Sequence, residues 1–312
     1  MAAQAGDRFG VRWGLAGGTT LRSIDEVRET TRYAVSAGFD GLWISHATAV
    51  DPIVALAAVA ADAEGLSEVG TSVVPIYGRH PIGLAQMART AQSALGGRFT
   101  LGIGAASKGA VATSMGLPWE HPLGYTREFI AGLQPLLAGR PANLEGEQLT
   151  ARWEPNIEAA DTPILLAALG PKMLDLAGRT VAGTSVGQCG PRTIRTYVAP
   201  TLRAAAEAAG RPEPRIMALI RLCVTDEPAD ALALARQTAA FYRSVPSYAA
   251  VQDREGLDEP AQLHLVGSWQ RVLDGLAEYA AAGVTDFRLE VAAPGAASRE
   301  TSRAALAEHL CC

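Results

Sequence analysis

The sequence has little charge of either sign and few cysteines. Charged residues make up 19% of its 312 residues, and the formal net charge is -5. A mildly acidic chain lacks the basic surface that nucleic-acid binding needs, so we expect no nucleic-acid partner. Only four cysteines are present, and their spacing fits neither a metal site nor a disulfide scaffold. We therefore expect no bound metal and a reducing, cytoplasmic location.

Long apolar runs are also missing. No stretch of about 18 uncharged apolar residues occurs, so the sequence predicts no membrane-spanning helix and no membrane partner. The first ten residues, MAAQAGDRFG, contain no basic segment followed by an apolar one, so no signal peptide is expected. Hydrophobic residues nevertheless make up 48% of the chain, which is enough for a large buried core.

Short apolar runs alternate with amphipathic stretches along the whole chain. Eight runs have the near-continuous hydrophobicity of parallel strands that are covered on both faces. They are 11–16, 41–45, 69–75, 99–104, 163–169, 184–188, 214–224 and 285–292. Helical patterns separate them, and some open with capping signals such as Asp51-Pro52 or Ser23 with Glu26.

Eight strands that alternate with helices predict an α/β fold, namely a (β/α)8 TIM barrel with insertions. We expect a single domain over 1–312, because no linker or internal repeat divides the chain. Two polar or irregular segments, 139–162 and 245–266, are expected to be excursions from the barrel.

In such a barrel the active site lies at the C-terminal ends of the strands. Those ends carry small residues and amide-rich turns, without paired carboxylates or a Ser/His/Asp set. This surface suits a flat ring with a phosphate tail, which indicates that a bound organic cofactor performs the difficult step. The turns 169–173 and 188–192 place glycine and proline at helix starts and so leave N–H groups for an anion. Each is equally compatible with an ordinary strand-to-helix turn.

At these turns the chain resembles the luciferase-like monooxygenase superfamily, in its deazaflavin (coenzyme F-420)-dependent oxidoreductase branch. Four segments in order carry the resemblance. They are GFDGLWIS (38–45), TSVVPIYGRHPIGLAQMA (71–88) with GGRFTLGIG (96–104), LLAALGPKMLDLAGRTVAGT (165–184), and FYRSVPSYAAVQDREG (241–256). The resemblance implies a luciferase-like TIM barrel that binds coenzyme F-420 and forms a homodimer.

The resemblance also implies where the cofactor lies. Ser72 and Val73 match a bulge with a non-prolyl cis peptide, which presses against the back of the deazaflavin ring. His46 matches a polar position that borders the ring. Further implied contacts follow the third to sixth strands, and the last two turns among them would hold the ribityl phosphate. These positions are Val74, Ala105, Ala106, Ser107, Ala168, Leu169, Gly170, Pro171, Met173, Gln188, Cys189 and Gly190.

Two of these positions qualify the resemblance. Ser107 stands where some sugar-phosphate dehydrogenases of the branch carry a glutamate acid, so sugar-phosphate oxidation is not expected. Met173 faces either the cofactor or the helix core.

Three functions are compatible with the sequence. The first is an F-420-dependent reductase that transfers hydride to an activated C=C or C=N bond of a small metabolite, a biosynthetic intermediate or a modified peptide. The second is an FMN-dependent monooxygenase of the same superfamily, and the third is a non-catalytic cofactor-binding barrel. We expect an enzyme of the first kind.

A reductase also needs a proton source. His46 is the first candidate, because imidazole titrates near neutral pH, and Tyr77 and His80 are the next candidates. Alternatively, His46 only hydrogen-bonds the cofactor, and His80, which precedes Pro81, only caps a helix.

Overall fold

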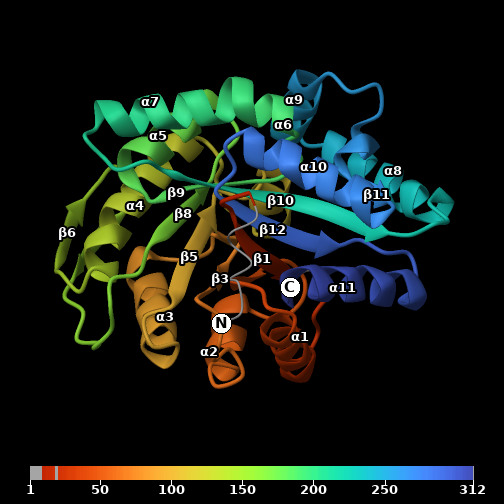
Figure 1. The fold of residues 1–312 in the computed structure, drawn as a ribbon. Helices are drawn as coiled ribbons and strands as arrows, with labels where there is room; N and C mark the ends of the chain where they lie inside the picture. The colour runs from red at the N-terminus through yellow and green to blue at the C-terminus, as the bar shows by residue number, and fades with distance from the viewer. Residues whose placement is uncertain (1–8, 18–19, 312) are drawn as a thin grey trace.

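Eight parallel strands close into a barrel that is surrounded by helices (Figure 1). The computed structural model describes residues 9–17 and 20–311, so most of the N-terminal stretch used for the signal-peptide prediction lies outside the described residues. The strands are β1 (Arg12–Gly17), β2 (Gly41–Ile44), β3 (Glu68–Thr71) with its continuation β4 (Val74–Pro75), β5 (Phe99–Gly104), β8 (Ile164–Ala167), β9 (Gly183–Val186), β10 (Arg215–Val224) and β12 (Asp286–Val291). The order is β1-β2-β3-β5-β8-β9-β10-β12 and back to β1. All eight predicted strands are confirmed.

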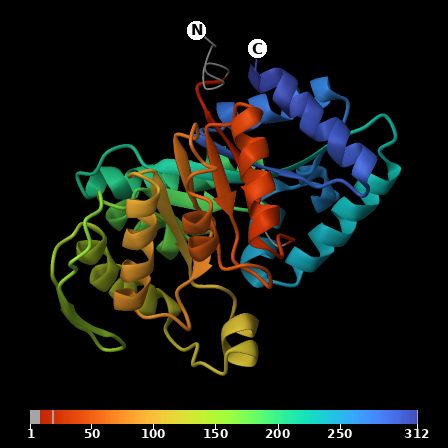
Figure 2. The same ribbon diagram turned by 90° about the horizontal axis from the view of Figure 1, so that it is seen from below.

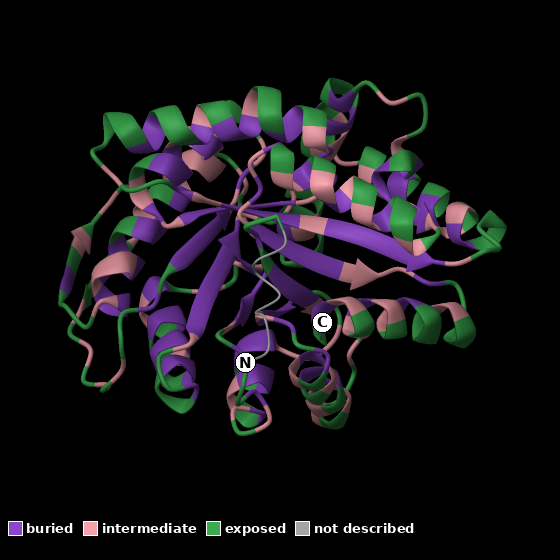
Figure 3. Cartoon of the chain, viewed as in Figure 1, coloured by how far each residue is buried: buried purple, intermediate pink, exposed green. Residues whose placement is uncertain are grey.

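The helices form the outer layer, and the strands inside it are buried almost throughout (Figure 3). The helices are α1 (Ile24–Ser36), α2 (Pro52–Ala58), α3 (Pro81–Ala94), α4 (Pro122–Leu137), α5 (Pro171–Thr180), α6 (Pro191–Thr193), α7 (Ala199–Ala208), α8 (Ala229–Arg243), α9 (Pro246–Glu255), α10 (Trp269–Ala281) and α11 (Ala296–Cys311). The predicted caps are present, since Ser23 Oγ accepts from the Glu26 N–H and the Asp51 carboxylate accepts from the N–H groups of Ile53 and Val54.

Two helices differ from the prediction. The sequence predicts one helix over 191–209, but a π-helical turn, Ile194–Val198, separates α6 from α7. Pro200 follows this turn and has no N–H for a regular bond to the residue four positions earlier, which accounts for the irregularity. Helix α2 ends at Ala58, although the apolar pattern continues to residue 63.

Both predicted excursions have structure of their own. The first contains an antiparallel hairpin, β6 (Ala142–Glu145) with β7 (Thr150–Trp153). The second contains α9, a 3-10 turn (Pro260–Leu263) and β11 (Leu265–Gly267), which pairs with the C-terminal end of β10. No helix within the described ranges is long and apolar enough to cross a membrane.

Trp43 fills the barrel interior near the N-terminal ends of the strands. Neighbouring strands carry glycine where they face this indole. A Cβ at Gly14 would lie 2.6 Å from the indole Cδ1, and a Cβ at Gly70 would lie 2.5 Å from its Cζ3. The two glycines are therefore needed to admit a side chain as large as tryptophan.

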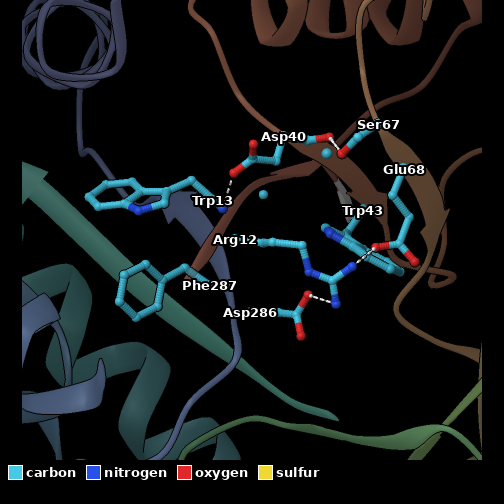
Figure 4. A pocket seen from close by; sticks show the side chains of 10 residues that line it. Arg12, Trp13, Asp40, Trp43, Ser67, Glu68, Asp286 and Phe287 are labelled. Carbon is cyan, nitrogen blue, oxygen red and sulfur yellow. Dashed lines mark hydrogen bonds and ion pairs between the residues drawn. The ribbon is translucent and has the colours of Figure 1, made fainter. Parts of the chain in front are cut away.

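An ion network closes the same end of the barrel, and Figure 4 shows its part at Arg12, Glu68 and Asp286. Arg215 pairs with Glu68 at 2.7 Å and with Asp286 at 2.8 Å, and Arg12 contacts the same two carboxylates. Burial alone would lower the pKa of Arg215, but its hydrogen bonds and charge pairing with the two carboxylates raise it. The cavity among these residues measures about 10 Å³, barely enough for one water molecule. The N-terminal end of the barrel is therefore closed.

Substitution of Gly70 by alanine tests the packing around Trp43 at this end of the barrel. The added Cβ would lie 2.4 Å from the Thr100 carbonyl oxygen as well as 2.5 Å from Trp43, and neither neighbour is the end of a flexible chain. We expect Gly70→Ala to lower the free energy of unfolding by roughly 1–3 kcal/mol in urea denaturation. The control is Gly83→Ala in α3, where nothing lies within 4 Å and alanine should stabilise the helix. Equal unfolding midpoints for the two variants would contradict the placement of Trp43.

Candidate functional site

The third barrel strand is interrupted by a bulge at its C-terminal end. The peptide between Ser72 and Val73 is cis, as the family resemblance implies. The neighbouring strand makes room for the bulge with two glycines. A Cβ at Gly102 would lie 2.0 Å from the Thr71 carbonyl oxygen, and a Cβ at Gly104 would lie 3.0 Å from Val73 Cγ2. The sequence GIG at 102–104 is therefore a requirement of the bulge.

Hydrogen bonds from both sides of the barrel hold the bulge. Ser45 Oγ donates to the Ser72 carbonyl oxygen at 3.1 Å, and the hydroxyls of Ser72 and Ser185 lie 2.8 Å apart. The His46 N–H donates to the Val73 carbonyl oxygen at 3.4 Å. Neither Ser45 nor Ser185 is among the site residues predicted from the sequence. Strand alternation could have found Ser45, which is two residues after the inward-facing Trp43.

His46 lies beside the bulge and is partly exposed. Burial lowers its pKa, the charge of Arg79 lowers it further, and the charge of Asp51 opposes this effect. Arg79 pairs with Asp51 at 2.8 Å, and Asp51 also caps α2. The imidazole is therefore predominantly neutral at neutral pH and able to accept a proton.

The other two predicted proton donors have structural contacts. His80 Nδ1 accepts from the Ile82 N–H at 3.3 Å, and its Nε2 lies 3.0 Å from the Thr150 carbonyl oxygen. Both ring nitrogens are engaged at the start of α3, which favours the capping alternative over the catalytic one for His80. The Tyr77 ring stacks on Tyr125 with 4.3 Å between centroids, and burial raises the pKa of its phenol.

The loop after β5 presents small side chains next to the bulge. Ala105 and Ser107 are partly buried and Ala106 is exposed. Ala106 has φ +62°, a left-handed conformation that residues other than glycine rarely adopt. Ser107 Oγ accepts from the Ala110 N–H at 3.3 Å, and a π-helical turn, Gly109–Ser114, then projects from the body (gold in Figure 2). This conformation orders the loop without placing a bulky group over the bulge.

The turn after β8 has the open helix start that the sequence predicts. Gly170 is the N-cap of α5 and provides no side-chain hydrogen bond, and a Cβ there would meet nothing within 4 Å. Gly170, Pro171 and Lys172 are exposed, whereas Leu169 is partly buried. Pro171 has no N–H, and the N–H groups of Met173 and Leu174 donate to the Gly170 carbonyl oxygen. The Lys172 N–H and ammonium at this helix start are thus the groups available to an anion.

Three other residues that were predicted to contact the cofactor, Val74, Ala168 and Met173, belong to the hydrophobic core or pack against it. Val74 is 0% exposed and Ala168 is 2% exposed, and both belong to the hydrophobic core. The two residues therefore offer almost no surface to a cofactor, which counts against their predicted contacts. Their neighbours Val73 and Ala167 are partly exposed instead. Met173 is partly buried and packs against the core, which favours its helix-core alternative.

The turn after β9 is already filled by a carboxylate of the protein itself. Glu255, at the end of α9, accepts from the N–H groups of Arg192 at 3.0 Å and Thr193 at 2.8 Å. A Cβ at Gly190 would lie 2.2 Å from the Glu255 carboxyl carbon. This contact argues against the predicted phosphate site at this turn, because an internal carboxylate occupies the start of α6.

The flanking residues of this turn are equally enclosed. Cys189 is 2% exposed, and burial together with the Glu255 charge raises the pKa of its thiol. The Gln188 side chain is 5% exposed and accepts a hydrogen bond from Gln252 Nε2 at 3.1 Å. These contacts join the turn to α9 rather than to a ligand.

Removal of the Glu255 carboxylate should convert this turn into an anion site. We expect Glu255→Ala to destabilise the protein by about 1–3 kcal/mol, because the buried N–H of Thr193 and the part-buried N–H of Arg192 lose their acceptor. Inorganic phosphate should then raise the melting temperature of the variant but not that of the wild type. Asp253→Ala is the control, since this exposed carboxylate on the same helix only pairs with Arg243 at the surface. An equal phosphate response in wild type and Glu255→Ala would contradict the assignment.

Comparison with known proteins agrees with the predicted family and fold. The sequence profile described as luciferase-like monooxygenase matches residues 10–286. The chain is 30% identical over 250 residues to a 5,10-methylenetetrahydromethanopterin reductase of Methanolobus tindarius, which covers 78% of this chain and 76% of the relative. It is 33% identical over 224 residues, 65% of each chain, to an F420-dependent glucose-6-phosphate dehydrogenase of Beutenbergia cavernae.

A solved structure has the same fold. An F420-dependent secondary alcohol dehydrogenase in complex with an F420-acetone adduct superposes with a TM-score of 0.80. The superposition covers 96% of this chain and 97% of the other, at 17% sequence identity.

Proposed function

The chain belongs to the luciferase-like monooxygenase family, and we propose that within this family it is an F420-dependent oxidoreductase that acts as a reductase on a small molecule. The main support is the 30% identity to a reductase over 78% of the chain. The F420-dependent relative from Beutenbergia cavernae supports the choice of cofactor.

The residues at the strand ends fit a deazaflavin. Gly104 and Ala167 are neighbours on adjacent strands, since a Cβ at Gly104 would lie 3.2 Å from Ala167 Cβ. Because both residues are small, they leave the face of the bulge free of large side chains. We assign the ring to the bulge at Ser72 and Val73, and the phosphate to the open start of α5 at Gly170. When bound, the deazaflavin supplies a hydride from the carbon that replaces N5 of a flavin.

The protein's own part is to position, to desolvate and to move a proton. The Ser45 and Ser185 hydroxyls fix the bulge, so the surface that meets the ring is pre-organised. His46 is the group at the bulge that exchanges a proton near neutral pH. Ser107 carries no carboxylate and its hydroxyl accepts from the backbone, which argues against the acid–base role of the sugar-phosphate enzymes.

Cofactor titration tests the proposal. We expect the protein to quench F420 fluorescence at concentrations at least tenfold lower than those at which it binds FMN. Gly104→Ala should weaken F420 binding roughly tenfold, or about 1.4 kcal/mol, because the new Cβ displaces Val73. Gly109→Ala in the same loop meets nothing within 4 Å and should bind like the wild type.

Other outcomes of this titration identify the alternatives. Tight FMN binding with oxygen consumption and no F420 binding would contradict the proposal and favour the monooxygenase. Retained F420 without turnover on any unsaturated substrate would favour a non-catalytic barrel.

The pH dependence of the reduction tests His46. Its pKa lies below the ordinary 6.5, so the protonated fraction that can donate grows as the pH falls below neutrality. We expect kcat for substrate reduction to rise with falling pH and His46→Gln to remove this rise. Tyr77→Phe should keep it, because the Tyr77 phenol stays protonated throughout this range. A pH profile that is unchanged in His46→Gln would exclude His46 as the proton donor.

A further inference from the structure

Two arginines of the barrel interior differ in whether their charge is balanced. Arg215, near the N-terminal ends of the strands, contacts both Glu68 and Asp286. Arg288 lies on β12 beside Gly14 of β1 and Leu219 of β10, and it is 6% exposed. Among the described residues, no carboxylate pairs with Arg288. The charge of Glu290, two residues further along β12, acts on Arg288 without a direct ion pair. The barrel therefore holds one buried guanidinium with direct ion pairs and one without.

The hydrogen bonds of Arg288 are incomplete as well. Its Nη2 donates to Ser45 Oγ, while its Nε is buried and has no partner. Burial lowers the pKa of Arg288 to about 10, so it remains charged at neutral pH. A buried charge with an unused donor is costly unless something else completes its contacts.

The nearby carboxylate is already used by a second arginine. Arg221 on β10 is 9% exposed and pairs with Glu290 at 3.0 Å. It also donates to the Tyr242 hydroxyl at 3.2 Å. His264, 5% exposed, adds no charge, because burial and then the Arg221 charge lower its pKa to about 3. The cluster thus contains two guanidinium groups and one carboxylate, which leaves one positive charge unbalanced.

This excess charge lies next to the bulge. Ser45 accepts from Arg288 and itself donates to the Ser72 carbonyl oxygen, so two hydrogen bonds connect the guanidinium to the predicted ring surface. On the other side of the cluster, Tyr242 of α8 and Tyr248 of α9 lie with 4.9 Å between their ring centroids. A small anion bound at Arg288 would therefore lie beside the reacting groups and be shielded from solvent.

We propose that Arg288, with the second guanidinium of the cluster, Arg221, nearby, binds a carboxylate of the substrate. The substrate is then an unsaturated or imino compound with an acid group. This inference rests on the proposed function, because it treats the bulge as the cofactor surface. A guanidinium presents parallel N–H donors that match the two oxygens of a carboxylate. The bound carboxylate supplies both the missing counter-charge and the missing acceptor.

The test compares two probes that differ only in charge, but-2-enoate and but-2-enamide. Calorimetric titration of the wild type should show the carboxylate binding at least tenfold more tightly than the amide. Arg288→Met should abolish this preference. Arg288→Lys, which keeps the charge but lacks the parallel N–H donors of a guanidinium, should retain part of it. Arg236→Met is the control, because Arg236 is exposed on α8 in a surface pair with Glu259.

Two results would overturn the inference. One is equal binding of acid and amide by the wild type, which requires no variant to fold. The other is an undiminished preference in folded Arg288→Met.

A parallel F420 titration separates this inference from the proposed function. The tail of the cofactor also carries acidic groups, so the affinity for F420 must be measured in the same variants. We expect Arg288→Met to bind F420 as the wild type does. A tenfold loss of F420 affinity with the but-2-enoate preference intact would assign Arg288 to the cofactor and overturn the substrate assignment. A carboxylate preference in a protein that does not bind F420 would instead refute the proposed function alone.

Discussion

The close approach of β3 to β5 at Gly102 is the contact on which the site depends. Any side chain at this position would meet the Thr71 carbonyl oxygen, so the bulge at Ser72 and Val73 exists only because β5 has glycine there. With the bulge in place, the Ser72 carbonyl oxygen and hydroxyl reach Ser45 and Ser185 from different strands. One pair of glycine positions on β5 thus determines the shape of the surface that we assign to the cofactor ring.

The two ends of the barrel interior illustrate a division between stability and function. At the N-terminal ends, Trp43 and a balanced ion network leave almost no free volume. Toward the C-terminal ends, Arg288 has neither a direct ion pair among the described residues nor a full set of hydrogen bonds. Such local violations of good packing are expected where a protein binds a ligand.

The sequence predicts the barrel well because its signals are local. Each strand is an apolar run, and caps such as Asp51 lie within three residues of the groups they satisfy. Tertiary contacts were not predictable in this way. Glu255 reaches the start of α6 from 62 or 63 residues away, and no pattern near Gly190 indicates that its N–H groups are already taken.

Arg288 is an intermediate case. It lies in the predicted strand 285–292, between Asp286 and Glu290 at a spacing of two residues, which is the pattern of one strand face. In a closed barrel, charges at that spacing inside a buried strand must face the interior. The sequence therefore contains a signal for this face, but not for its missing counter-ion, which depends on the pairing of Glu290 with Arg221.

The site map as a whole is tested most directly by hydrogen–deuterium exchange with and without F420. We expect F420 to slow exchange in 72–77, 104–108 and 169–174, which contain the bulge, the loop after β5 and the open start of α5. We expect no change in 189–194, where Glu255 already occupies the N–H groups. Protection confined to 189–194, or none at the bulge, would contradict this assignment of the site.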